Sequence, residues 1–336
     1  MARNVRNNFW YLDNFIKPSY QVMLMFLTLG LLYFFSYIRL QQFINVDPAP
    51  GISTLQRSGQ QGALSIETGF YVRNFLEFDM LTNKFVVDAY VWFNFDKNKI
   101  DQKVIDDFSF GKAEIEYKSK PYTHEIGDRL FIGYDVRIKF SSNLNYRYFP
   151  LDDHCLYITL NNMSLSADKM LLETKPSTFL ISDHTYTSGW KVGNYKSING
   201  LKTIVLDKKE PLKSFSFPRI TFLIDFISTS MKRFTLLVFP LFVIFFIGLF
   251  SLGLDTKKYY SSVISIASGM MTALVAYRFV IEAMSPKVSY FMMSDYIFNL
   301  FLILNFMIFL VNTIFLDMIA RYRGALILLF HMILII

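Results

Sequence analysis

FTLLVFPLFVIFFIGLFSLGL occupies residues 234–254 and contains no charged side chain. A helix rises about 1.5 Å per residue, so a helix over this stretch covers the hydrocarbon core of a bilayer, which is about 30 Å thick. Three further apolar stretches follow, at residues 259–284, 291–316 and 324–336. The last third of the chain, residues 229–336, is therefore predicted to form a four-helix transmembrane domain.

A second kind of apolar segment lies near the N-terminus, where residues 22–38 read VMLMFLTLGLLYFFSYI. A cleaved signal peptide and a retained anchor both fit an apolar segment at this place. The apolar core is long for a signal peptide, and no small-x-small cleavage site follows closely. We therefore expect a transmembrane anchor at residues 18–39, after a cytoplasmic segment at residues 1–17 that carries Arg3, Arg6 and Lys17.

Between these apolar regions the sequence changes to period two. Phe85, Val87, Ala89, Val91 and Phe93 alternate with more polar residues, which is typical of a half-buried strand. Many short strands without helical periodicity indicate a β-sandwich at residues 67–228. Residues 40–66, rich in Pro, Gly, Gln and Ser, are predicted to be a linker. Further strands are expected near residues 68–78, 111–118, 129–140, 154–162, 187–197, 200–206 and 215–227, with a turn at Asn199-Gly200.

Loop charges predict the orientation in the membrane. Lys257 and Lys258 follow the first apolar stretch of the bundle, and Arg321 and Arg323 precede the last one. Cytoplasmic loops carry an excess of Lys and Arg. We therefore expect five spans in a plasma or inner membrane, with the N-terminus in the cytoplasm and the β-sandwich extracellular or periplasmic.

Composition argues against several function classes. The net charge is +7, but many of the positive charges flank apolar stretches and do not form one stripe, so nucleic acid is not an expected partner. There is one cysteine, and the four histidines show no metal-ligand spacing. No nucleotide-binding glycine pattern and no nucleophile–base spacing occurs. We expect no catalytic residues, no metal and no cofactor, and hence a protein that is not an enzyme.

The second helix of the bundle carries a stripe of small and hydroxyl-bearing residues at helical spacing. Close helix packing is one interpretation, since small residues let backbones approach. The other is a water-filled pore lined by one such stripe per subunit, where hydroxyls replace part of an ion's hydration. The stripe consists of Ser261, Ser265, Gly269, Thr272 and Ala276, and Phe279 and Ala283 continue it. A ring of Phe279 is then a candidate hydrophobic constriction.

Arg278 and Glu282 lie beside this stripe, four residues apart. Charged side chains in a span are costly near the bilayer centre and less so near its surface. They form either a mutual ion pair at the membrane surface or a contact between subunits that changes on opening.

Four segments together resemble the pentameric ligand-gated ion channels, the Cys-loop receptor superfamily. YRYFPLDDHC at residues 146–155 resembles the family's Phe-Pro-Phe-Asp loop, and FVVDAYVWF at residues 85–93 resembles its second strand. Pro240 matches the proline of the first pore-domain helix, and the resemblance implies a role in gating for it. VIEAMSPKVSYFMMSD at residues 280–295 resembles the end of the pore-lining helix and the turn after it. The closest resemblance is to the prokaryotic proton-gated branch, which lacks the loop disulfide.

The resemblance implies a homopentamer in a lipid membrane, with an extracellular domain that senses a small ligand or protons. The second helix of the bundle then lines a central pore for inorganic ions. Phe149, Pro150 and Asp152 are expected against Ser285, Pro286 and Lys287, coupling the sandwich to the pore, and the cationic partner expected for Asp152 is Lys232 or Arg233. Simple turn chemistry is the alternative explanation for Pro150 and Pro286.

The chain also departs from the family pattern. The N-terminal span is unusual, the Trp-x-Pro segment of the ligand site is absent from residues 100–125, and no acetylcholine-like ligand is expected. Lys257 and Lys258 stand near the inner mouth, where cation-selective members carry carboxylates, which favours anion or poorly selective conduction. His154 is either a proton sensor or a hydrogen-bonded interfacial histidine.

Two other functions remain open from the sequence. A non-conducting membrane receptor or scaffold could keep this fold and bind a partner through its sandwich. A membrane hydrolase or transporter predicts buried acid–base pairs within the spans, and only Arg278 and Glu282 are visible there.

Overall fold

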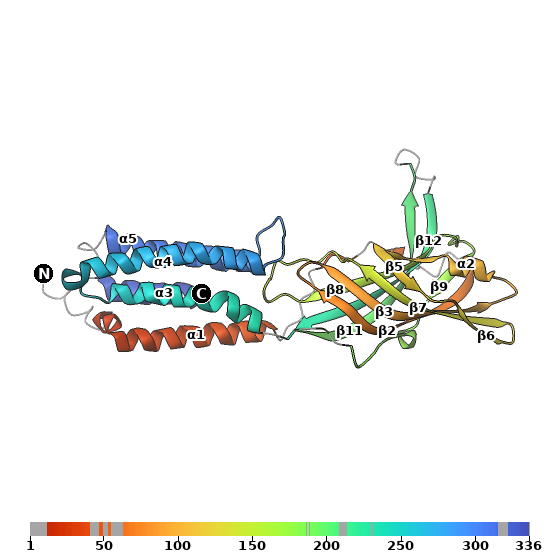
Figure 1. Ribbon diagram of the computed structural model, residues 1–336, viewed down its shortest axis with the longest axis horizontal. Coiled ribbons are helices and arrows are strands. Elements are labelled where there is room, and N and C mark those ends of the chain that lie inside the picture. The colour runs from red at the N-terminus through yellow and green to blue at the C-terminus, as the bar shows by residue number, and fades with distance from the viewer. Residues whose placement is uncertain are drawn as a thin grey trace, which may run out of the picture. The chain divides into compact units, whose positions relative to one another are not determined.

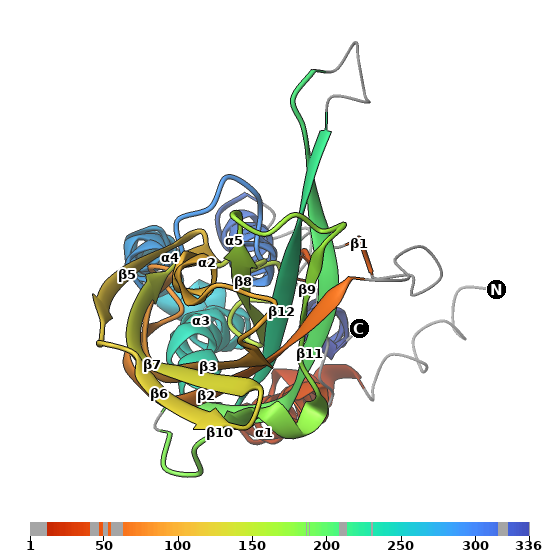
Figure 2. The ribbon, with the colours of Figure 1, turned by 90° about the vertical axis from the view of Figure 1, so that its right-hand side faces the viewer.

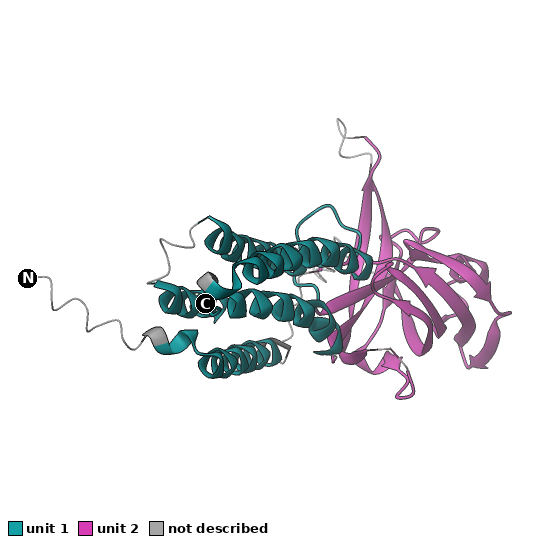
Figure 3. Ribbon diagram, turned by 60° about the vertical axis from the view of Figure 1, so that its left-hand side comes forward, with its two compact units in different colours: residues 1–43, 146–152, 230–336 teal, residues 44–145, 153–229 magenta. Residues whose placement is uncertain are grey.

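The computed structural model describes residues 12–40, 47–49, 53–54, 63–185, 187, 189–207, 214–229, 231–314 and 322–335. The chain divides into two compact units, drawn in different colours in Figure 3. The helical unit contains residues 1–43, 146–152 and 230–336, and the β unit contains residues 44–145 and 153–229. The segment expected at the cytoplasmic N-terminus lies outside the described residues up to residue 11, as do Arg321 and most of the predicted linker.

The helical unit consists of long apolar helices. Its elements are η1 (Leu12–Ile16), α1 (Pro18–Leu40), α3 (Met231–Leu252), α4 (Thr256–Met284), α5 (Met293–Thr313) and α6 (Arg323–Ile335). Within the described residues, α1, α3, α4 and α5 are long and apolar enough to cross a membrane. The fifth expected span corresponds to α6, which is short and has 13 residues.

Aromatic and polar contacts hold these helices together. α3, α4 and α5 pack against one another (Figure 1), and Phe242 and Phe301 meet edge to face with ring centroids 5.0 Å apart. The α1–α6 contact includes a polar pair, in which the Thr28 hydroxyl lies 2.8 Å from Nδ1 of His331 and both side chains are buried. Buried polar groups among apolar helices stabilise association when they are paired. The N-terminal helix is therefore packed as part of the bundle.

The β unit is a sandwich of two sheets. Its first sheet has the order β1-β11-β12-β8-β4, and its second has the order β10-β2-β3-β7-β5, with β6 paired to β7 and β9 to β2. The order of β2, β3 and β7 can be followed in Figure 2. The bounds are β1 (Ser53–Thr54), β2 (Leu64–Asp79), β3 (Lys84–Asp96), β4 (Phe108–Gly111), β5 (Ala113–Lys118), β6 (Tyr122–Ile126), β7 (Arg129–Phe140), β8 (His154–Asn162), β9 (Met170–Glu173), β10 (Phe179–Ile181), β11 (Trp190–Val205) and β12 (Ser214–Ser228), with the short helices α2 (Gln102–Asp106) and η3 (Pro176–Thr178).

The core lies between the two sheets and is rich in phenylalanine. Phe70 of β2 stacks on Phe222 of β12 with ring centroids 4.8 Å apart, and Phe179 contacts both rings. The face predicted for β3 is confirmed, because its five alternating apolar residues are fully buried: Phe85, Val87, Ala89, Val91 and Phe93. Strands at residues 129–140 and 154–162 are also confirmed.

Two predicted strand boundaries are wrong. No turn forms at Asn199-Gly200, because β11 continues through both residues and Gly200 pairs with Arg219 of β12. The Asn199 side chain accepts from the Thr174 N–H and donates to the Thr174 carbonyl oxygen, so its amide group is hydrogen-bonded without a turn. The strand predicted at residues 111–118 is divided at Lys112, whose φ of 54° separates β4 and β5 into different sheets.

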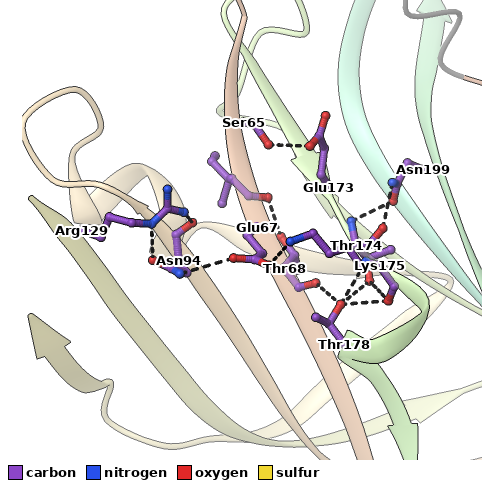
Figure 4. Close-up of polar contacts among 11 residues, drawn as sticks. Ser65, Glu67, Thr68, Asn94, Arg129, Glu173, Thr174, Lys175, Thr178 and Asn199 are labelled. Atoms are coloured by element: carbon purple, nitrogen blue, oxygen red, sulfur yellow. Dashed lines mark hydrogen bonds and ion pairs between the residues drawn. The ribbon is translucent and has the colours of Figure 1, made fainter. Parts of the chain in front are cut away.

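A polar network ties β2 to its neighbours on the surface of the β unit (Figure 4). Lys175 donates to Glu67 at 2.8 Å, and Asn94 donates to the same carboxylate at 3.4 Å. Arg129 in turn donates to Asn94 at 2.9 Å. The hydrogen bond from Lys175 is the largest influence on Glu67 that lowers its pKa below the ordinary value.

Candidate pore face and coupling loop

One face of α4 anchors this helix to the bundle. Val263, Ala267, Met270, Leu274 and Ile281 are all buried and follow one another at spacings of four, three, four and seven. Residues so spaced share one side of a helix, and this side packs on α3 and α5. The opposite side of α4 therefore points away from α3 and α5.

The opposite face of α4 is open in the single chain. All seven stripe residues named from the sequence are exposed: Ser261, Ser265, Gly269, Thr272, Ala276, Phe279 and Ala283. A Cβ at Gly269 would have no atom within 4 Å, and Phe279 is 71% exposed. The described helices of the same chain do not cover this face, so close packing within one subunit does not explain it.

The exposed faces of the other helices have a different character. There the exposed residues are large and apolar, as expected for contact with lipid: Phe26, Phe34 and Phe35 of α1, Leu236, Phe239 and Ile247 of α3, Ile303, Phe306 and Met307 of α5, and Leu329 and Met332 of α6. On α4 the large exposed residues are Tyr259 and Tyr260 near its start and Val275, Phe279 and Val280 toward its C-terminal end. The small and hydroxyl-bearing surface thus belongs to one helix of the unit.

The start of α4 differs from its body. Tyr259 has a non-helical backbone (φ −122°, ψ 29°), so the helix is kinked one turn after it begins. The Lys258 ammonium lies 5.2 Å from the centre of the Tyr259 ring. The Lys257 side chain lies outside the described part of the structure. Lys258 is exposed at this end of the small-residue face.

Pro240 leaves a carbonyl of α3 without its usual helical partner, because proline has no N–H to donate to residue 236. The Tyr277 hydroxyl of α4 donates to this Leu236 oxygen at 2.7 Å and lies 3.3 Å from the Leu237 oxygen. The proline predicted to matter for gating therefore creates an acceptor that the proposed pore helix uses.

Arg278 joins α4 to the start of α5. Its Nη1 donates to Asp295 at 2.7 Å, and its Nε donates to Glu282 at 2.9 Å. The Asp295 side chain is 9% exposed and also accepts from the backbone N–H of Met292. The ion pair between Arg278 and Glu282 was one of the two alternatives expected from the sequence, and it is present. Asp295 is a second partner of Arg278 that was not predicted from the sequence.

The loop at residues 146–152 belongs to the helical unit, although β7 and β8 on either side of it in the chain belong to the β unit. The Met293 N–H donates to the Arg147 oxygen at 2.9 Å, and the Ser294 N–H donates to the Phe149 oxygen at 3.0 Å. The first N–H groups of a helix lack intrahelical acceptors. The loop therefore caps the N-terminus of α5.

Phe149 anchors this loop from its other side. Its ring is fully buried, and the Arg233 guanidinium of α3 lies 5.9 Å from the ring centre. Pro150 and Asp152 are also buried. The loop thus contacts the start of α3 and the start of α5 within one unit.

The other predicted coupling residues are Ser285, Pro286, Lys287 and Lys232, and they differ in exposure. The Tyr146 N–H donates to the Tyr290 hydroxyl at 2.8 Å, so the bonds of the loop reach residues after the predicted Ser285, Pro286 and Lys287. The Ser285 hydroxyl donates to the Ile281 oxygen, Pro286 is buried, and Lys287 and Lys232 are exposed.

His154 begins β8 and is fully buried. Its Nδ1 lies 3.2 Å from the Asp47 carboxylate, which also accepts the N–H groups of Asn145 and Cys155. Asp47 lies in the predicted linker, where nothing in the sequence indicated a contact with this strand.

Groups of His, Cys, Asp and Glu large enough to hold a metal ion do not occur among the described residues. In comparisons with known proteins, no family model matches this chain and no curated protein matches it.

Proposed function

We propose that this chain is an integral membrane protein and one subunit of a homopentameric ligand-gated ion channel. The observation that carries the proposal is the contrast between the small, hydroxyl-bearing exposed face of α4 and the large apolar exposed faces of the other helices. Lipid favours the latter, whereas a face of Ser, Thr, Gly and Ala is suited to water. The fivefold assembly rests on the resemblance of residues 85–93, 146–155 and 280–295 to the pentameric channel family.

In the assembled ring, one α4 from each subunit lines the pore. Ser265 and Thr272 face ions at the middle of the helix, and Phe279 forms a hydrophobic constriction toward its outer end. A narrow apolar ring closes a pore by dewetting. Lys257 and Lys258 near the inner mouth repel cations over about one Debye length, roughly 8 Å at physiological salt, so conduction favours anions or is weakly selective.

Movement of the coupling loop is transmitted to α4 through two links in the helical unit. The loop carbonyls of Arg147 and Phe149 hold the first turn of α5, and Asp295 of this turn holds Arg278 of α4. The loop is continuous in the chain with β7 and β8, so rearrangement of the β unit by a ligand or by protons displaces it. The β unit is extracellular or periplasmic, and the N-terminus is cytoplasmic.

Current across a planar bilayer tests this function. The purified full chain is expected to conduct, with its conductance changed in Thr272→Ala and its closed-state leak raised in Phe279→Ala. Ile303→Ala, on the exposed apolar face of α5, is the matched control and leaves both unchanged. Silence of the wild type and of all three variants over many ligands and pH values would instead indicate a receptor or scaffold without a pore. Electron microscopy of detergent particles gives the subunit number, and any number other than five contradicts the pentamer.

A further inference from the structure

The β unit contains a cavity of about 410 Å³, and the charged residues that the structure describes in its wall are all basic. It is lined by residues 48–49, the end of β4, the loop at residues 141–143, and parts of β8, β11 and β12. Its lining includes Lys112, Lys202 and Arg219, together with Tyr157 and Thr159. No Asp or Glu is among the described residues that line it. This volume falls in the range of sites for small molecules.

Arg219 is the central feature of the cavity wall. The residue is 6% exposed, and its Nε donates to the Asn161 oxygen at 2.7 Å. A guanidinium has five N–H donors in a planar fork. Among the described residues no carboxylate forms an ion pair with Arg219, and burial alone lowers its pKa below the ordinary value. A buried charge without a counter-ion is costly, so the site favours an anion that supplies one.

The two lysines strengthen this preference from the sides. Lys202 is half-buried, with its ammonium 6.0 Å from the ring of Phe217, and no ion pair of Lys202 occurs in the described part of the chain. Lys112 donates to the neutral side chain of Asn143 at 3.3 Å. Neither lysine neutralises Arg219. Three cations around a space that is also lined by Thr159 match an oxyanion, which accepts several hydrogen bonds at once.

We propose that this cavity binds a small molecule through a carboxylate or phosphate group. The Arg219 fork makes the bidentate contact, Lys202 and Lys112 complete the charge, and Thr159 donates from its hydroxyl group. The site is contained in the β unit and does not depend on whether α4 lines a pore.

Isothermal titration calorimetry on the full chain in detergent, at fixed ionic strength, tests the proposal. The probes are acetate, inorganic phosphate and acetamide, which has the shape of acetate without its charge. Saturable binding is expected for at least one anion and not for acetamide. Tighter binding of acetate identifies an organic carboxylate as the ligand class, and tighter binding of phosphate identifies a phosphate.

Three variants locate the binding. Arg219→Gln is expected to weaken anion binding by about tenfold or more, and Lys202→Gln by about threefold or more. Lys196→Gln is the matched control, because Lys196 is an exposed lysine of the same strand six residues from Lys202, about 20 Å along an extended chain. It should bind as the wild type does.

Because Arg219→Gln also removes the bond to Asn161, Lys202→Gln carries the test if the first variant does not fold. Binding by Lys202→Gln that equals wild-type binding overturns the proposal, as does equal response to acetate and acetamide. The calorimetric measurement does not involve conduction. A failure of the anion-binding proposal therefore leaves the pore proposal standing, and observed anion binding does not support the pore proposal.

Discussion

The Tyr277 hydroxyl of α4 donates to the Leu236 carbonyl of α3 at 2.7 Å, and Pro240 is the reason that this carbonyl is available. A normal residue at position 240 would occupy the Leu236 oxygen with its own N–H. The proline thus gives the proposed pore helix a fixed attachment point on its neighbour, and the pair can be dissected by mutation.

Tyr277→Phe is expected to lower the stability of the chain by about 0.5–1.5 kcal/mol, because one interhelical hydrogen bond is lost. Thermal unfolding in detergent measures the effect. In a Pro240→Ala background the Leu236 carbonyl regains an intrahelical donor, so the same substitution should cost less. Equal costs in both backgrounds would show that the two residues are not coupled.

Asp295→Asn is expected to destabilise the helical unit by about 2–4 kcal/mol. It removes a nearly buried partner of Arg278 and leaves that guanidinium undercompensated. Glu282→Gln is the matched control, because Glu282 is 57% exposed, and its pair with Arg278 is expected to contribute at most about 0.5 kcal/mol. Melting temperatures of both variants make the comparison. A larger loss in Glu282→Gln than in Asp295→Asn would refute the assignment of Asp295 as the main partner.

Gly69→Ala is expected to destabilise the β unit by about 1–3 kcal/mol through overpacking. A Cβ at this position would lie 2.1 Å from the indole of Trp92, the residue opposite it on β3. Trp92→Leu in the same chain removes the clash, so the double variant should recover part of the loss. Thermal unfolding of the single and double variants decides, and a double variant less stable than the sum of the two single losses speaks against the steric cause.

The Glu67 carboxylate predicts a pH effect of definite sign. Its pKa is lowered from 4.5, mainly by the hydrogen bond from Lys175, so the ionised form is favoured in the folded state. Its contribution is present above the unfolded pKa and is lost as pH falls through the lowered folded pKa. Wild type should therefore lose more stability than Glu67→Gln between about pH 6 and pH 3. A difference in free energy of unfolding between wild type and Glu67→Gln that stays constant or widens on acidification would contradict this prediction.

The elements that sequence could predict are those with strong periodicity or long apolar runs. β7 and β8 begin and end where alternation and turn residues placed them, and α3 follows its uncharged stretch. The direction of the α4 stripe also followed from helical spacing, since Ser265 and Thr272 lie on the open side of the helix. Local pattern suffices for such features because one residue type recurs at a fixed interval.

Contacts between distant residues were not accessible in the same way. Asp47 reaches His154 from a linker without periodicity, and Asp295 reaches Arg278 from the next helix. Arg219 is one basic residue in an apolar strand, and only the packing of five other segments around it makes a cavity. The Asn199-Gly200 pair carried a turn signal that the tertiary bonds of Asn199 to Thr174 overrode.

In the proposed channel, the open face of α4 meets water along an axis shared by the subunits. Reaction of engineered cysteines with a charged aqueous thiol reagent, followed by current in a bilayer, tests it most directly. The native Cys155 is fully buried, which raises its thiol pKa to about 12, so it should stay inert and give no background. We predict that Ser265→Cys and Thr272→Cys react and reduce the current, while Ile303→Cys on the apolar face of α5 does not. Failure of Ser265→Cys and Thr272→Cys to react in any attainable state, or equal reaction at Ile303→Cys, would contradict the account.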